Sequence, residues 1–101
     1  MMELIPQEIR KRIPKLYDTE DIADPIVHVK LFMPDSNYTW YITEMSIDED
    51  ICFGYVVSTY GSELGYFSLN EIKGVRGTLG LGVERDITFK SVPLSSIKKA
   101  S

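Results

Sequence analysis

Histidine and cysteine are scarce in this chain of 101 residues, which contains one of each, His28 and Cys52. A single cysteine cannot form an internal disulfide, and a Cys/His zinc centre needs more ligands than these two, so both are excluded. No run approaches the ~18 apolar residues of a membrane span. The first residues lack a basic start followed by an apolar stretch, so we expect no signal peptide, no membrane contact and a cytoplasmic location.

Catalytic and metal-binding patterns are also missing. His28 lies on the polar phase of its segment, and no spacing pairs it with Cys52, which we expect to be a buried structural thiol. The glycines of residues 77–82 follow an expected helix and precede an expected strand, the reverse of a dinucleotide-binding loop. The acids of residues 48–50 lack the alternate spacing and the glycine of a calcium loop. We therefore expect no enzyme activity, no cofactor and no metal.

What the chain does contain is typical of one small folded domain. It is 44% hydrophobic and 26% charged, which is close to the globular average, and its length supports one core. We expect a single domain over residues 1–101, in which residues 94–101 form a loose basic tail outside the core.

The charge is unevenly distributed along the sequence. The formal net charge is −4, but residues 17–71 hold eleven carboxylates against a single base, Lys30. The other Lys and Arg residues lie in residues 1–16 and 72–101. An acidic middle repels a phosphate backbone and attracts a basic groove built to hold nucleic acid. The pattern therefore predicts a partner protein with a basic surface.

Apolar spacing predicts one helix, and a capping box predicts a second. Ile5, Ile9 and Ile13 recur at helical intervals, and Pro14 disfavours helical geometry at the residue before it, so an N-terminal helix should end near Arg12. Ser68 with an acid three residues later matches a capping box. A short helix over residues 69–75 should follow it.

Alternation of apolar and polar residues predicts strands between these helices. Gly61-Ser62 fits a tight hairpin turn, and short turns favour antiparallel neighbours. The expected fold is therefore α+β, an antiparallel meander of four to five strands covered on one face by the N-terminal helix and the short helix near residues 69–75. The expected strands are residues 26–33, 38–44, 51–60 and 64–67, with a fifth around Ile87 and Phe89.

Two sets of side chains are candidates for binding. In the first, carboxylates meet a basic channel of a host protein and an aromatic residue serves as anchor. This set is Asp35, Trp40, Tyr41, Asp48, Glu49 and Asp50. In the second, an open sheet face stacks on bases and basic residues contact phosphates. This set is His28, Lys30, Phe32, Tyr55, Arg76 and Arg85, with Lys90 as a further phosphate contact.

The order of segments resembles a small family of uncharacterised bacterial domains, a domain of unknown function carried on plasmids, conjugative elements and phages. The resemblance covers nearly the whole chain and implies an accessory protein of a mobile element, similar to components of larger anti-restriction proteins. It transfers no catalytic residue. The segments that carry it are Ile13-Pro14-Lys15-Leu16-Tyr17, Val27-His28-Val29-Lys30, Pro34-Asp35-Ser36-Asn37, Thr39-Trp40-Tyr41, Glu63-Leu64-Gly65-Tyr66-Phe67-Ser68-Leu69 and Gly80-Leu81-Gly82-Val83-Glu84-Arg85-Asp86.

Three functional hypotheses follow. The first is a non-enzymatic protein-binding module of a mobile element, an acidic nucleic-acid mimic that acts in anti-restriction or another form of anti-defence. The alternative is a single-stranded nucleic-acid-binding domain that uses an aromatic sheet face. The third is a small enzyme with a carboxylate acid or base in a pocket. Its candidate residues are Asp35, Glu44 and Glu84.

Overall fold

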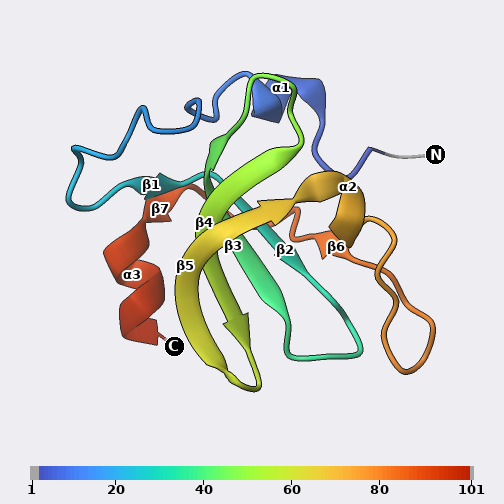
Figure 1. The fold of residues 1–101 in the computed structure, drawn as a ribbon. Helices are drawn as coiled ribbons and strands as arrows, with labels where there is room; N and C mark the ends of the chain where they lie inside the picture. The colour runs from blue at the N-terminus through green and yellow to red at the C-terminus, as the bar shows by residue number, and fades with distance from the viewer. Residues whose placement is uncertain (1–2, 101) are drawn as a thin grey trace.

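A five-stranded antiparallel sheet forms the centre of the structure, a computed structural model that describes residues 3–100. Its strands lie in the order β5-β4-β3-β2-β6, so that four strands consecutive in sequence form a meander and the last strand adds beside β2 (Figure 1). The predicted α+β class and antiparallel meander are confirmed. The strands are β2 (Val29–Phe32), β3 (Thr39–Met45), β4 (Ile51–Ser58), β5 (Gly61–Ser68) and β6 (Glu84–Arg85).

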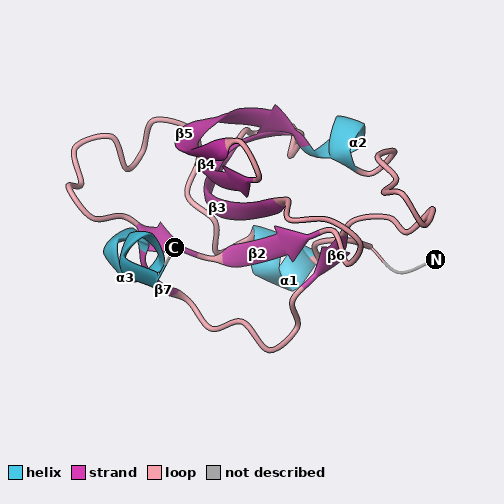
Figure 2. Cartoon of the chain, turned by 90° about the horizontal axis from the view of Figure 1, so that it is seen from below, coloured by secondary structure: helices cyan, strands magenta, loops and turns pink. Residues whose placement is uncertain are grey.

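The remaining elements are short and surround this sheet. A two-stranded sheet joins distant parts of the chain and lies with α3 at one end of the molecule, whereas α2 lies at the opposite end (Figures 1 and 2). No helix among residues 3–100 is long and apolar enough to cross a membrane. These elements are α1 (Gln7–Arg10), β1 (Ile26–Val27), α2 (Leu69–Ile72), β7 (Val92–Pro93) and α3 (Leu94–Ala100).

One face of the sheet carries the core. Apolar side chains of β2, β3 and β4 pack there against α2 and against residues 4–13, which contain α1 and which we call the α1 segment. These two parts of the chain cover this face, as predicted. Burial raises the pKa of the Cys52 thiol to about 12, so the thiol stays protonated and is a packing group. The buried cluster is Ile5, Ile13, Val29, Leu31, Met33, Trp40, Ile42, Met45, Cys52, Leu69 and Ile72.

The opposite face, which we call the open face, carries half-buried aromatic and basic side chains. Lys30, Tyr41 and Tyr55 are register partners across three neighbouring strands. Phe32 lies two residues further along β2 and so points to the same side. The alternation in the sequence predicted this grouping.

A β-bulge at Thr43 changes the alternation within β3. Ile42 pairs with Gly54 and Glu44 with Phe53, so Thr43 is the extra residue. Because one added residue moves all later side chains to the other face, Glu44 lies on the open face and Met45 returns to the core. Four consecutive residues, 42–45, are therefore buried.

The buried Glu44 carboxylate holds the loop that follows the α1 segment. Its two oxygens accept hydrogen bonds from the backbone N–H groups of Tyr17 and Thr19, each at 2.9 Å, and from the Thr19 hydroxyl. Tyr17 has a positive φ of 72°, so the chain turns sharply here. A carboxylate that accepts several donors in a buried site fixes the donors in place.

Two local predictions along the strands were wrong. The β4–β5 turn is centred on Thr59 and Tyr60, and Gly61, with φ of 128°, already begins β5. The strand predicted around Ile87 and Phe89 is instead the pair Glu84–Arg85, because the Asp86 carboxylate accepts from the Thr88 N–H and hydroxyl and turns the chain. Ile87 is 75% exposed.

The ends of the chain also differ from the predictions. The first helix is limited to α1, with Pro6 at its N-cap. Residues predicted as one strand over 26–33 divide at His28 into β1 and β2. The expected loose tail is the helix α3, whose Leu94 is buried and whose first turn is capped by Asp24 through Ser95 N and Oγ. Ser101 lies outside the described residues.

Candidate functional site

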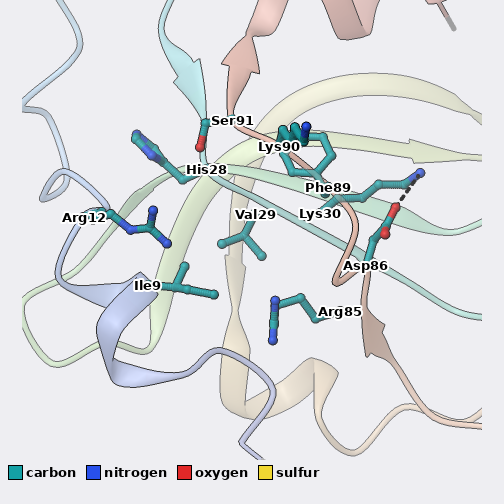
Figure 3. Close-up of a pocket in the computed structure, with 10 residues that line it drawn as sticks. All are labelled: Ile9, Arg12, His28, Val29, Lys30, Arg85, Asp86, Phe89, Lys90 and Ser91. Carbon is teal, nitrogen blue, oxygen red and sulfur yellow. Dashed lines mark ion pairs between the residues drawn. The ribbon is translucent and has the colours of Figure 1, made fainter.

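A pocket lined by basic side chains opens at the edge of β2, beyond the point where its pairing with β6 ends. Its volume is about 320 Å³. Ile9 and Val29 contribute apolar lining, and one acid, Asp86, is present. The basic residues, which define what we call the cationic pocket, are Arg12, His28, Lys30, Arg85 and Lys90 (Figure 3).

Four separate segments bring these basic groups together. Arg12 follows α1 in a turn in which its N–H donates to the Ile9 carbonyl. Lys30 lies on β2, and Arg85 lies on β6 as the register partner of Leu31. Lys90 belongs to the connection between β6 and β7. The pocket therefore exists only when the N-terminal segment, the sheet edge and residues 86–91 are assembled.

Most of the positive charge in this pocket is not neutralised by the protein. Lys30 Nζ forms an ion pair with Asp86 Oδ2 at 3.7 Å. Among residues 3–100, no carboxylate oxygen lies within 4.0 Å of the charged nitrogens of Arg12, Arg85 or Lys90. Four basic side chains thus line a pocket with a single carboxylate, and a bound anion would stabilise this arrangement.

Arg85 is oriented by the backbone. Its Nε donates to the Leu4 carbonyl at 3.1 Å, which fixes the plane of the guanidinium. The two terminal nitrogens form no hydrogen bond to any of the described residues. A fixed guanidinium with free terminal nitrogens is suited to bidentate recognition of a phosphate or carboxylate.

His28 responds to the same surroundings. Its partial burial, followed by the charge of Arg12, lowers the pKa of the imidazole below the usual 6.5. The neutral ring is therefore the form that the folded protein favours. The charge of a bound anion would oppose that of Arg12 and favour the imidazolium.

This shift predicts a stability that falls in mild acid. In the unfolded chain His28 takes up a proton near pH 6.5, whereas in the folded chain His28 does so only at lower pH. The free energy of unfolding should keep its full His28 contribution above pH ~6.5 and lose it as the pH drops toward the folded pKa. Urea denaturation between pH 7.5 and pH 5.5 should show a smaller decline for His28→Gln than for the native chain. Equal declines in both proteins would contradict the prediction.

The structure brings together part of the second predicted set. His28, Lys30 and Arg85 line the cationic pocket. Phe32 lines a neighbouring pocket of about 390 Å³ that shares Lys30 and Asp86 with it. Tyr55 lies on the open face two strands away from Lys30.

Arg76 does not join this group. Its guanidinium donates to the carbonyls of Lys73 and Val75, close to Gly82. Lys90, predicted as a phosphate contact, also lines the cationic pocket, whereas sequence reasoning missed Arg12. The basic character of Arg12 was visible, but only the fold shows that residues so far apart in the sequence approach one cavity.

The predicted acidic set is distributed over several local roles. The Asp48 carboxylate accepts from the Ser46 hydroxyl, a hydrogen bond that lowers the pKa of Asp48. Glu49 accepts from Gln7 and pairs with Arg10 at 3.2 Å, and these contacts lower the pKa of Glu49 in that order.

The other members of this set are also engaged within the fold. Asp50 accepts from the Ser68 hydroxyl and the Asn70 N–H at the start of α2. Asp35 accepts from the Leu79 N–H at 2.8 Å. Trp40 is 6% exposed in the core, whereas Tyr41 is half-buried on the open face.

A further hollow lies on the open face, near the loop whose backbone donates to Glu44. It has a volume of about 330 Å³ and an aromatic lining in which Tyr66 contacts Phe53, with ring centroids 4.8 Å apart, and Tyr17, at 6.5 Å. Of the predicted acid or base candidates, Glu44 lines this hollow and Glu84 lines a different pocket.

Comparison with known proteins identifies the family of the chain. No curated protein and no solved structure matches it. The family model described as "Protein of unknown function (DUF2958)" matches residues 4–101, nearly the whole sequence. The chain therefore belongs to the DUF2958 family, a family of proteins of unknown function.

Proposed function

We propose that this protein binds single-stranded nucleic acid, with phosphate held in the cationic pocket and bases stacked on the open face. The observation that carries the proposal is the approach of Arg12, Lys30, Arg85 and Lys90 to one cavity that contains a single carboxylate. Phosphate oxygens are the anionic groups that Arg and Lys recognise on a nucleic-acid strand.

Aromatic side chains lie beside these cations, as base stacking requires. Tyr41 contacts Phe89 with ring centroids 6.2 Å apart, and Lys30 Nζ lies 5.9 Å from the Tyr41 ring centre. Phe32 is half-buried in the pocket next to Lys30. A sheet face with aromatic residues and flanking cations is the arrangement that small single-strand-binding domains use. Double-stranded nucleic acid keeps its bases stacked internally and would lose these contacts.

The net charge of −4 affects how the binding should depend on salt. At long range the chain repels a polyanion, but exposed charges are screened over ~8–10 Å at physiological ionic strength. Binding should therefore depend on close contacts in the cationic pocket and should weaken steeply as salt rises.

The acidic-mimic hypothesis remains a prediction, as do a mobile-element origin, an anti-defence role and a cytoplasmic location. It ranks second because the carboxylates of Glu49 and Asp50 are engaged by Arg10 and by the start of α2. A host partner with a basic surface would compete with these internal bonds. In the cationic pocket, by contrast, Lys30 is the one cation that pairs with a carboxylate within residues 3–100.

Fluorescence anisotropy with a labelled single-stranded oligonucleotide tests the proposal. The double variant Arg12→Gln/Lys90→Gln should bind about tenfold more weakly at low salt, and its slope of log affinity against log salt should fall by about one to two. Both residues are exposed and form no ion pair within the described part of the chain, so the variant should fold normally.

Lys11→Gln is the matched control, because Lys11 is an exposed neighbour of Arg12 that does not line the pocket. This variant should keep nearly native affinity. Absence of binding by the native protein at low salt would refute the proposal. Equal affinity of the native and double-variant proteins would refute the assigned site.

A further inference from the structure

The cations of the pocket line one hollow from several sides rather than forming a track, and the Lys30 ammonium turns to Asp86. Figure 3 shows the guanidinium groups of Arg12 and Arg85 on either side of Ile9 and Val29, with Lys90 on the far side from Arg85. A strand carries a phosphate at every nucleotide, so a protein that follows the backbone needs cations repeated along its path. A closed group of cations instead fits one anion.

The hollows next to the pocket are unfavourable for further phosphates. The neighbour beyond Arg85, with a volume of about 510 Å³, shares Arg85 and Asp86 with the cationic pocket and adds the carboxylates of Glu3 and Glu84. A second phosphate placed there would meet like charge.

On the other side, the hollow beyond Lys30 contains no additional cation. Its lining includes Phe32, Met33 and Pro34, with the hydroxyl residues Ser36 and Thr39. An aromatic ring and small polar groups suit a nucleoside better than a phosphate. The cationic pocket therefore accommodates one phosphate, and the hollow beyond Lys30 accommodates a base beside it.

From these observations, and resting on the function proposed above, we infer that the cationic pocket holds the terminal phosphate of a single strand rather than an internal phosphodiester. A terminal phosphomonoester carries about −1.5 to −2 charges at pH 7 and three free oxygens. An internal phosphodiester carries one charge, and both of its neighbours continue as phosphates. Arg12, Lys90 and the oriented guanidinium of Arg85, none of which pairs with a carboxylate of residues 3–100, match the more highly charged group.

The test compares oligonucleotides of one sequence that differ only at their ends. The probes are strands with a phosphate at the 5′ end, with a phosphate at the 3′ end, and with hydroxyls at both ends, together with the circular form, which has no end. At least one phosphate-terminated strand should bind about tenfold more tightly than the hydroxyl-terminated and circular strands, a difference of about 1.4 kcal/mol.

Variants connect this preference to the pocket. Arg12→Gln should bring the affinity for the phosphate-terminated strand close to that for the hydroxyl strand, whereas Lys11→Gln should preserve the preference. A nucleoside monophosphate added as competitor separates a strand end from a free nucleotide, because the free nucleotide lacks the neighbouring base contacts on the open face. It should displace the strand only at much higher concentration than an unlabelled phosphate-terminated strand.

The outcomes separate this inference from the proposed function. Equal binding of all strands, weakened by the Arg12→Gln/Lys90→Gln variant, would overturn the inference and support the proposed function. Binding of the monophosphate without binding of any strand would overturn both. A preference for the phosphate end that survives Arg12→Gln and Lys90→Gln together would overturn the assignment to this pocket.

Discussion

Gly54→Ala should prevent folding, or destabilise the protein by roughly 4 kcal/mol or more. Gly54 is buried in β4 opposite Ile42, directly beside the β-bulge, and the two strands approach closely there. A Cβ at this position would overlap the carbonyl oxygen of Tyr41 and lie 2.8 Å from its carbonyl carbon. The obstacle is backbone in the middle of the sheet, so no side-chain rotation relieves it.

Gly65→Ala is the matched control, because Gly65 is the register partner of Gly54 on β5. A Cβ added at Gly65 meets no atom within 4 Å, so the free energy of unfolding should change by less than about 1 kcal/mol. Urea denaturation followed by circular dichroism measures both variants. A Gly54→Ala protein as stable as Gly65→Ala would show that β3 and β4 can separate without cost.

Glu44→Ala should lower the free energy of unfolding by about 3 kcal/mol. The substitution removes the acceptor for the N–H groups of Tyr17 and Thr19 and leaves both donors without their partner in a largely buried site. Each unsatisfied donor costs about 1–3 kcal/mol. The loop that begins at Tyr17 should become more accessible, and limited proteolysis in this segment should accelerate together with the loss of stability.

Glu63→Ala provides the control for the loss of a carboxylate. Glu63 is exposed on β5 and forms no ion pair within the described residues, so its removal should change stability by no more than about 0.5 kcal/mol. Thermal or urea unfolding distinguishes the two variants. A cost below about 1 kcal/mol for Glu44→Ala would mean that water replaces the carboxylate at the loop.

The sequence predicted the meander and the two faces of its first strands because alternation is a local property. Val29 and Leu31 face the core and Lys30 faces outward, as the period of two requires. The bulge at Thr43 was not predictable, since the run of buried residues there depends on how β4 approaches β3. The end of β6 was not predictable either. The Asp86 side chain accepts hydrogen bonds from Thr88 and ends the strand, although residues 86–90 alternate as a strand would.

The candidate site was less predictable than the fold. A linear count of charge identified an acidic middle, but it could not show that Glu49 pairs with Arg10 in the fold. It also could not show that Arg12, two residues after Arg10, has no carboxylate partner among the residues that the structure describes. Nor could it show that Lys30, the single base of that span, joins cations from both ends of the chain. Pairing in space decides which charges remain available to a ligand.

The pairing of β1 with β7 has a consequence for synthesis on the ribosome. Residue 27 pairs with residue 92, so this contact closes about two-thirds of the length of the chain. The hairpins of β2 to β5 need only residues 29–68, and local hairpins form before contacts between distant residues. A nascent chain can therefore complete its central meander before Arg85 and Lys90 have left the exit tunnel, and the cationic pocket forms only after the meander.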